Sequence, residues 1–261
     1  MLLDAGSGAP PHGTPVRQPA APSFAADPAA ALAAYARDGF HVEHDLLSAA
    51  ECAALRAAAA ELSPEPGGPR APVMNPHRAH PAFLRGLCHP ALVAILERLL
   101  GSPVSGLQSQ YFPCVAGTPG FTTHQDNHYV EAARDAFASA WAALDDADAG
   151  NGALIVYPGS QREPLLPMAQ LPAARAHATQ AFNALRQQVP VPPDYEPCTL
   201  AVPRGAVVFL HGHLLHGSHD NRSTRGRPAL LTTYIRRGAS FRRGRSAGRG
   251  EIDVHGGGGA R

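Results

Sequence analysis

The tripeptide His124-Gln125-Asp126 places an imidazole and a carboxylate two residues apart, and further histidines follow about ninety residues later. On an extended strand, residues two apart point to the same face, so both side chains could reach one ion. Two imidazoles and one carboxylate bound facially fill three octahedral positions of a metal and leave three open, as in non-haem Fe(II) oxygenases. His-X-Asp alone is weak evidence in a chain with 14 histidines. The pattern indicates an iron site only if the distal segment supplies a partner.

The distal segment offers four candidate ligands: His211, His213, His216 and His219. They follow a glycine turn at Gly205 and an apolar run, 206–210, that predicts a buried strand. A second apolar run, 228–235, begins after Arg227. An arginine at the start of a strand beside a metal is suited to bind a carboxylate with both arms of its guanidinium. Residue types alone leave the choice among the four histidines open.

Several ordered stretches strengthen this hypothesis. They are Gly-Thr-Pro-Gly at 117–120 before His-Gln-Asp-Asn-His-Tyr at 124–129, Trp-Ala-Ala-Leu-Asp-Asp at 141–146, Asn-Gly-Ala-Leu at 151–154 with Pro-Gly-Ser at 158–160, and 216–227. From about residue 108 to residue 236 the chain therefore resembles the phytanoyl-CoA dioxygenase family of Fe(II)- and 2-oxoglutarate-dependent oxygenases. One departure is Gln161, where relatives usually carry histidine.

The resemblance implies a specific set of site residues. The implied iron ligands are His124, Asp126 and His216. For 2-oxoglutarate it implies Arg227 and Ser218 at the distal carboxylate and Trp141 in the pocket wall. In the family the carboxylate-binding arginine lies about eleven residues after the distal ligand, as Arg227 lies after His216.

His211 has Arg222 at the same spacing, but Arg222 stands in the predicted turn Asn221-Arg222-Ser223 and is expected to face solvent. His216 is therefore preferred as the distal ligand. The implied activity uses Fe(II), 2-oxoglutarate and O2, and hydroxylates an aliphatic C–H of a small-molecule metabolite with release of succinate and CO2. Related halogenases have Gly or Ala at the carboxylate position, so Asp126 favours hydroxylation or another oxidation.

Two alternatives remain open. One is a metal-binding jelly roll without oxygenase activity, such as a cupin-like isomerase or a sensor, and the other is a non-enzymatic scaffold. Arg227 discriminates, because a carboxylate-binding arginine has no evident purpose where no oxo-acid binds. Many relatives also carry a lysine where this chain has Cys114, and all 22 basic residues here are arginine. A second cationic contact to the co-substrate would have to come from arginine or be replaced by neutral hydrogen bonds.

Three further residues are candidate substrate contacts: Gln110, Asn127 and His128. His128 is included because it would share strand parity with the proposed ligands. The predicted fold is mainly β with flanking helices, a double-stranded β-helix (jelly roll, cupin-like) that opens at one mouth. Helices are predicted over 28–37, 49–62 and 89–100 from their caps and periodicity. Another is predicted over 168–188, where it could contribute to a substrate lid.

The chain is expected to comprise a flexible leader (1–26), a single catalytic domain (27–236) and an arginine- and glycine-rich tail (237–261). The composition of the tail predicts a solvated, disordered end. The alternatives are a phosphate or carboxylate clamp that folds over the pocket, or weak attraction to nucleic acid.

The formal net charge of +1 gives no electrostatic reason to expect a nucleic-acid partner. The four cysteines are dispersed without Cys-X-X-Cys spacing, which predicts neither a zinc site nor disulfides and favours the cytoplasm. No apolar run approaches the ~20 residues of a membrane span, and no signal-like segment begins the chain. The expected partner is a small-molecule substrate, and oligomeric state is not determined by these features.

Overall fold

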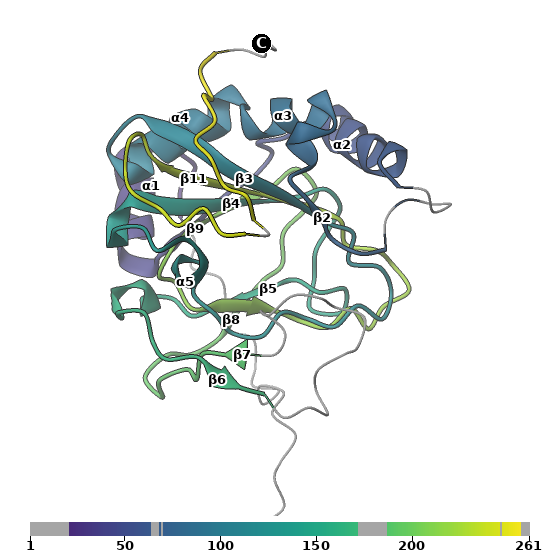
Figure 1. The fold of residues 1–261 in the computed structure, drawn as a ribbon. Coiled ribbons are helices and arrows are strands. Elements are labelled where there is room, and N and C mark those ends of the chain that lie inside the picture. The colour runs from purple at the N-terminus through teal and green to yellow at the C-terminus, as the bar shows by residue number, and fades with distance from the viewer. Residues whose placement is uncertain (1–20, 64–67, 69, 172–186, 246, 257–261) are drawn as a thin grey trace, which may run out of the picture.

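A six-stranded antiparallel sheet forms the centre of the computed structural model, which describes residues 21–63, 68, 70–171, 187–245 and 247–256 (Figure 1). Its strands, in spatial order, are β1 (Phe40–Glu43), β9 (Val207–His211), β4 (Phe137–Ala143), β11 (Ala229–Arg236), β3 (Val104–Phe112) and β2 (Val73–Met74). A second sheet has the order β10 (His216–Ser218), β5 (Leu154–Val156) and β8 (Cys198–Leu200). Crossovers between strands distant in sequence, together with the packing of the two sheets, give the predicted jelly roll.

The strands of the large sheet alternate between two buried faces. In β9, Val207 and Phe209 belong to the core beneath the helices, whereas Val208 and Leu210 belong to the core between the sheets. Because side chains alternate along a strand, both faces of a central strand can be apolar when both are covered. The inter-sheet core is completed by residues of the small sheet such as Leu154 and Leu200. The inner face of the large sheet is therefore the wall from which a site can be built.

Helices cover the outer face of the large sheet (Figure 1). They are α1 (Pro28–Asp38), α2 (Ala49–Glu61), α3 (Pro81–Leu87) and α4 (Pro90–Leu100). The predicted capping signals are present: Asp27 caps α1, Ser48 and Glu51 form a capping box on α2, and Gly101 ends α4 in the left-handed conformation. Short helical turns occur at η1 (Pro76–Arg78), α5 (Asn127–Val130), η2 (Arg134–Ala136) and η3 (Ser160–Arg162).

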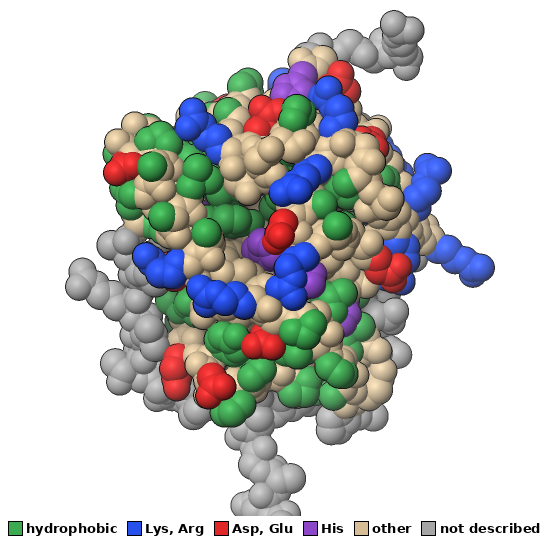
Figure 2. All heavy atoms as spheres, turned by 90° about the vertical axis from the view of Figure 1, so that its left-hand side faces the viewer, with side chains coloured by type: hydrophobic (Ala, Val, Ile, Leu, Met, Phe, Trp, Pro, Cys, Tyr) green, Lys and Arg blue, Asp and Glu red, His purple; other side chains and the backbone are tan. Residues whose placement is uncertain are grey.

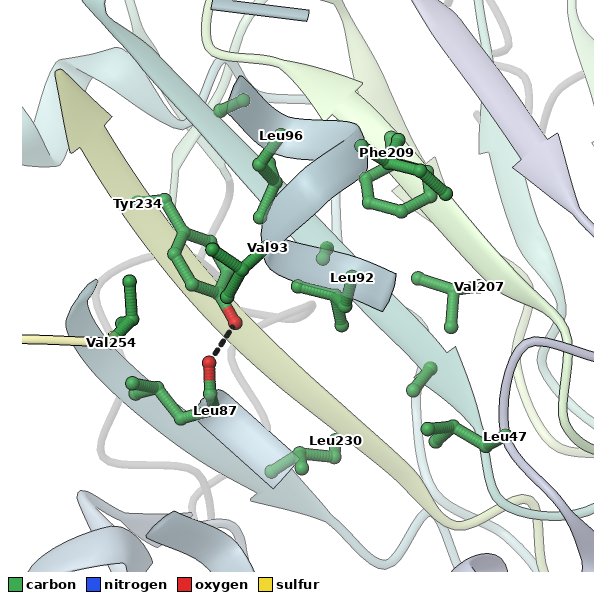
Figure 3. Close-up of a cluster of buried hydrophobic side chains, with 14 of the residues drawn as sticks. Leu47, Leu87, Leu92, Val93, Leu96, Val207, Phe209, Leu230, Tyr234 and Val254 are labelled. Atoms are coloured by element: carbon green, nitrogen blue, oxygen red, sulfur yellow. Dashed lines mark hydrogen bonds between the residues drawn. The ribbon is translucent and has the colours of Figure 1, made fainter. Parts of the chain in front are cut away.

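Aliphatic side chains fasten these helices to the sheet (Figure 3). Leu92 and Leu96 of α4 pack with Phe209 of β9 in the same buried cluster. The fully buried Tyr234 of β11 donates its hydroxyl hydrogen to the carbonyl oxygen of Leu87 at 2.8 Å. This bond pairs the buried hydroxyl of Tyr234, as burial of a polar group requires.

Two local predictions were wrong. Residues at the ends of the predicted 168–188 helix form strands instead, since β6 (Ala169–Gln170) pairs antiparallel with β7 (Gln187–Gln188). The stretch 172–186 between them lies outside the described residues. The expected strand through His128 is also replaced, because the chain enters α5 directly after the His-X-Asp motif. In the part of the chain that the structure describes, no helix is both long and apolar enough to cross a membrane.

The prediction of a solvated C-terminal end was wrong for its described part, which we call the C-terminal strap (residues 237–245 and 247–256). Ile252 forms an antiparallel bridge with Gly106 of β3, with hydrogen bonds of 3.0 and 2.8 Å. The Asn75 side chain donates to the carbonyl of Ala247 at 2.8 Å, and Val254 packs into the outer core. The strap therefore pairs with β3 along the same edge as β2, because backbone pairing and apolar burial outweigh its polar composition.

Candidate metal centre

Two histidines and one aspartate meet between the two sheets. Ligand atoms of His124, Asp126 and His216 all lie within 4.8 Å of one another. Asp126 Oδ1 is 3.5 Å from His124 Nε2 and 3.7 Å from His216 Nε2. The two nitrogen donors and the oxygen donor lie close together. Such a donor set suits a divalent metal such as Fe(II). No other group of this kind is found among the described residues.

Backbone contacts aim both imidazoles at this point. His124 Nδ1 lies 2.8 Å from the carbonyl oxygen of Thr122, and His216 Nδ1 lies 3.0 Å from that of Leu214. Since a carbonyl can only accept, each Nδ1 carries the hydrogen, and each Nε2 keeps its lone pair for a metal. The geometry of the chain therefore selects the tautomer that metal binding requires.

A backbone bridge brings the two histidines together across 92 positions of sequence. The amide of each donates to the carbonyl of the other, at 2.9 and 3.0 Å. The sequence predicted that Asp126 shares a strand face with His124. Instead, the backbone of Asp126 is already helical (φ −56°) at the entrance to α5. The turn of the chain, rather than strand parity, directs the carboxylate.

The other three distal histidines make different contacts. His211 Nε2 lies 3.1 Å from Asp135, His213 contacts Asn127 and the Glu163 carbonyl at 3.1 Å each, and His219 Nε2 lies 2.9 Å from the Thr199 hydroxyl. None of these imidazoles joins the cluster. The tertiary structure thus places His216, out of the four candidates, beside the His-X-Asp motif.

The electrostatics differ among the three residues of the cluster. Burial opposes protonation of His124, but the contact with Asp126 outweighs burial and raises the pKa of this imidazole. Burial, together with the charge of His124, lowers the pKa of His216 to about 4. Burial opposes ionisation of Asp126, but the neighbouring His216 and His124 outweigh it and lower the pKa of this carboxyl. Near neutral pH, His216 is therefore neutral and Asp126 is ionised, which are the forms that bind metals.

Ser139 of β4 orients the carboxylate. Its hydroxyl donates to Asp126 Oδ2 at 2.6 Å, which leaves Oδ1 facing the histidines. Loss of such an outer partner costs roughly 10–100-fold in metal affinity. We expect Ser139→Ala to weaken Fe(II) binding by that factor, measured by anaerobic titration. Ser105→Ala is the matched control, because Ser105 is equally buried and bonds Glu251 at 2.7 Å away from the cluster; equal iron affinities in the two variants would contradict the assigned role.

The cluster opens into a cavity of about 480 Å³ between the sheets. Most of its lining is apolar, from Phe112, Phe121, Phe137, Leu154, Leu210 and Leu231 among others. Besides the three cluster residues, the polar or charged side chains in the wall are Gln108, Gln110, Tyr129, Trp141, Ser218, Arg227, Thr233 and Arg249. A cavity of this kind suits small organic ligands held by a few polar groups. On the face turned toward the viewer in Figure 2, arginine side chains surround a hollow, with histidine and acidic side chains between them.

Arg227 is held in this wall without a charged partner. Its side chain is buried, and neither Nε nor Nη1 has a hydrogen-bond partner. The guanidinium lies 5.1 Å from the centre of the Trp141 ring, a cation–π contact that fixes its plane. Burial lowers the pKa of Arg227, but a guanidinium stays protonated in proteins. An unpaired buried cation facing a cavity is a site prepared for an anion.

The Asn-Gly motif packs beside this arginine. Gly152 has φ +100°, and a Cβ there would lie 3.0 Å from Cys114 Sγ and 3.5 Å from Arg227 Nε. Any larger residue would strain the backbone and press on both groups. Asn151 fixes the turn by donating its side chain to the Asp146 carbonyl at 2.8 Å. Cys114, which replaces the lysine of relatives, lies buried against Arg227 and adds no charge.

The predicted co-substrate and substrate residues have different positions. Arg227, Trp141, Ser218 and Gln110 all line the cavity, and Ser218 Oγ accepts a hydrogen bond from the Phe121 amide at 2.9 Å. Asn127 and His128 do not line the cavity. The Asn127 side chain is hydrogen-bonded to both backbone groups of Ala132, and His128 Nε2 lies 2.8 Å from the Leu166 carbonyl. The parity argument for His128 does not apply, because that residue is in α5.

Sequence reasoning missed four polar residues of the wall, Gln108, Tyr129, Thr233 and Arg249, and it also missed Ser139, which binds Asp126. Parity could have found two of them, because Gln108 precedes Gln110 by two positions and Ser139 precedes Trp141 by two. Arg249 gave no such signal, since only the path of the C-terminal strap brings it to the cavity. Together, fold and site define a jelly-roll protein with a facial two-histidine, one-carboxylate cluster.

Comparison with known proteins identifies the family within this class. The family model "Phytanoyl-CoA dioxygenase (PhyH)" matches residues 35–229, and the chain belongs to that family. It is 28% identical over 158 residues to a probable phytanoyl-CoA dioxygenase of Caenorhabditis elegans, covering 56% of this chain and 48% of that protein. It is 32% identical over 162 residues to the L-proline trans-4-hydroxylase of Streptomyces griseoviridis, covering 56% and 60%. The chain thus spans about half the length of these two relatives.

Solved structures confirm the fold. The non-heme alpha ketoglutarate dependent epimerase SnoN from nogalamycin biosynthesis, in complex with Fe3+, alpha ketoglutarate and nogalamycin RO, superposes with a TM-score of 0.68. That match has 22% sequence identity and covers 83% of this chain and 87% of the other. The prediction of a double-stranded β-helix with flanking helices is therefore confirmed.

Proposed function

We propose that this protein is an Fe(II)- and 2-oxoglutarate-dependent dioxygenase that hydroxylates an aliphatic C–H of a small-molecule metabolite and releases succinate and CO2. The observation that supports it most is a single cavity holding both the His124, Asp126 and His216 cluster and the unpaired Arg227. A metal-binding jelly roll that lacks oxygenase chemistry has no use for the second group. Membership of the PhyH family agrees with this assignment.

In this proposal the three cluster residues hold Fe(II), which supplies O2 activation when bound with 2-oxoglutarate. Arg227 binds the distal carboxylate of the co-substrate through one edge of its guanidinium, whose Nε and Nη1 have no hydrogen-bond partner within the protein. Ser218 Oγ already accepts from Phe121, so its own hydrogen is free to be donated to the same carboxylate. Trp141 keeps the guanidinium in place through its ring face.

The remaining wall positions the substrate and excludes water. Its aromatic and aliphatic side chains give an environment in which a C–H bond, rather than a polar group, faces the metal. We further propose a cytoplasmic location, supported by the four free cysteines, none of which is disulfide-bonded. The substrate itself is proposed to be a small molecule, since the cavity of about 480 Å³ must hold it beside 2-oxoglutarate.

Anaerobic addition of Fe(II) and then 2-oxoglutarate tests the proposal. We expect a weak visible charge-transfer band from the chelated keto-acid. We expect no such band when succinate replaces 2-oxoglutarate. Succinate is the control because it has two carboxylates, one carbon closer together, and lacks the keto group that chelates the metal. A folded, iron-loaded protein that gives no band would contradict the proposed function.

A further inference from the structure

A second buried guanidinium faces the cavity from the C-terminal strap. Arg249 is 7% exposed and lines the cavity wall. Its Nη1 donates to the Tyr129 carbonyl at 2.8 Å and to the Arg242 carbonyl at 3.3 Å, whereas Nε has no partner. Among the residues that the structure describes, no carboxylate lies within ion-pair distance of this side chain. Arg249 is therefore a second cation held in the wall by neutral contacts alone.

Arg249 and Arg227 reach the cavity from different parts of the fold. Arg227 precedes the end of β11 where Ala229 pairs with Phe112 of β3. The strap instead approaches the other end of β3, because Ile252 bridges Gly106, the partner of Tyr234 in β11. Burial lowers the pKa of Arg249, and the charge of Asp126 opposes this shift. One cation is thus available for the co-substrate and the other remains without an assigned ligand.

An unsatisfied amide lies on the strand beside the strap. Gln108 of β3 is 1% exposed, lines the cavity, and has no hydrogen-bond partner at either Nε2 or Oε1. In the sheet register it pairs with Thr233 of β11, which in turn pairs with Ser139 of β4, the residue that holds Asp126. Gln108 therefore lies in the same row of the inner face as the metal cluster. Buried amides normally have hydrogen-bond partners, so the unpaired Nε2 and Oε1 of Gln108 indicate that a ligand binds here.

We propose that Arg249 and Gln108 form the recognition site for an oxyanion group, a carboxylate or a phosphate, on the substrate that is oxidised. The guanidinium supplies charge and a planar donor, and the Gln108 amide donates a neutral hydrogen bond. The apolar part of the cavity wall then receives the aliphatic part of the molecule. This inference rests on the proposed function, because it assigns the substrate class of the same cavity.

Ligand binding to the full-length protein loaded with Fe(II) and saturated with 2-oxoglutarate under anaerobic conditions tests the assignment. The probes are C4 to C8 aliphatic monocarboxylates, their primary amides, and alkyl monophosphates of the same lengths. The readouts are the unfolding temperature and the perturbation of the charge-transfer band. We expect at least one anionic series to bind and its neutral counterparts not to bind, and the two anionic series distinguish carboxylate from phosphate recognition.

Variants separate this site from the co-substrate site. Arg249→Met should weaken binding of the anionic probe at least tenfold, Arg249→Lys should recover part of that loss, and the affinity for 2-oxoglutarate should stay unchanged in both. Arg245→Met is the matched control, since Arg245 is an exposed arginine of the same strap that does not line the cavity. Gln108→Leu keeps the volume and removes an unpaired amide, so we expect weaker anion binding with an unfolding temperature that does not fall.

The outcomes are distinct. Loss of anion binding in Arg249→Met and Gln108→Leu, with an intact 2-oxoglutarate band, supports the assignment. Equal binding of acids and amides, anion binding that survives both substitutions, or a wild-type protein that binds none of the anions while it binds 2-oxoglutarate, would overturn it. A wild-type protein that gives no 2-oxoglutarate band instead contradicts the proposed function itself.

Discussion

Replacing His216 by alanine is expected to lower the affinity for Fe(II) by more than about 100-fold, because loss of an outer partner of a ligand alone costs roughly 10–100-fold. The substitution leaves only His124 and Asp126 in the cluster. The 2-oxoglutarate charge-transfer band and all succinate formation should disappear with the metal. Iron stoichiometry after anaerobic desalting and 2-oxoglutarate-dependent succinate production are the measurements.

His128→Ala is the control for that substitution. His128 is close in sequence to the proposed ligands, but its ring contacts the Leu166 carbonyl and does not line the cavity. We expect this variant to bind one Fe(II) with wild-type affinity. The backbone bridge between residues 124 and 216 does not depend on the imidazole of His216, so His216→Ala should still fold. Wild-type iron affinity in folded His216→Ala would remove the basis of the metal assignment.

Replacing Arg227 by methionine is expected to weaken 2-oxoglutarate binding by roughly 30-fold to several thousand-fold, the range that corresponds to about 2–5 kcal/mol for one partner of a buried charge pair. Iron binding should be unaffected, because Arg227 is not part of the cluster. The measurement is titration of the charge-transfer band with 2-oxoglutarate in iron-loaded protein.

Arg227→Met should not destabilise the protein in the absence of 2-oxoglutarate. In the absence of an anion, Arg227 is a buried cation with two unpaired nitrogens, and replacing such a group with an apolar side chain of similar length is neutral or stabilising. We therefore expect Arg227→Met to unfold at the wild-type temperature or above it without 2-oxoglutarate, and to lose the stabilisation that 2-oxoglutarate gives the wild type.

Arg225→Met is the matched control for Arg227. Arg225 is exposed and pairs with Asp148 on the surface, two positions earlier in the chain. Arg225→Met removes a positive charge from the same segment as Arg227→Met does. Surface ion pairs such as the one with Asp148 contribute little to stability. We expect wild-type affinity for 2-oxoglutarate. If both variants weakened binding equally, the effect would be one of general charge, and Arg227 would not be the specific contact.

The path of the C-terminal strap changes how the pocket is understood. The family resemblance implies a lysine in many relatives where this chain has Cys114, and here that position holds a buried thiol next to Arg227. Arg249, from a segment whose composition predicted disorder, supplies the only other guanidinium among the cavity-lining residues that the structure describes. The cavity therefore keeps two cations although one of them comes from an unexpected part of the chain.

The sequence by itself determined the parts of this protein that depend on local chemistry. Capping residues predicted α1, α2 and α4 within one or two positions, because helix ends are fixed by hydrogen bonds that span only a few residues. Ordered motifs indicated the family.

Only the tertiary structure decided which distant groups share one point in space. Residue types left four distal histidines open, and the family spacing to Arg227 only gave His216 preference. The backbone bridge to residue 124 brings His216 into the cluster, because cross-strand pairing depends on the whole sheet. The same holds for Gln108 and Arg249, whose unpaired groups are visible only once β3 and the strap are side by side. A chain's long-range pairings carry no local signature, and so the second cation of this pocket could not be read from composition.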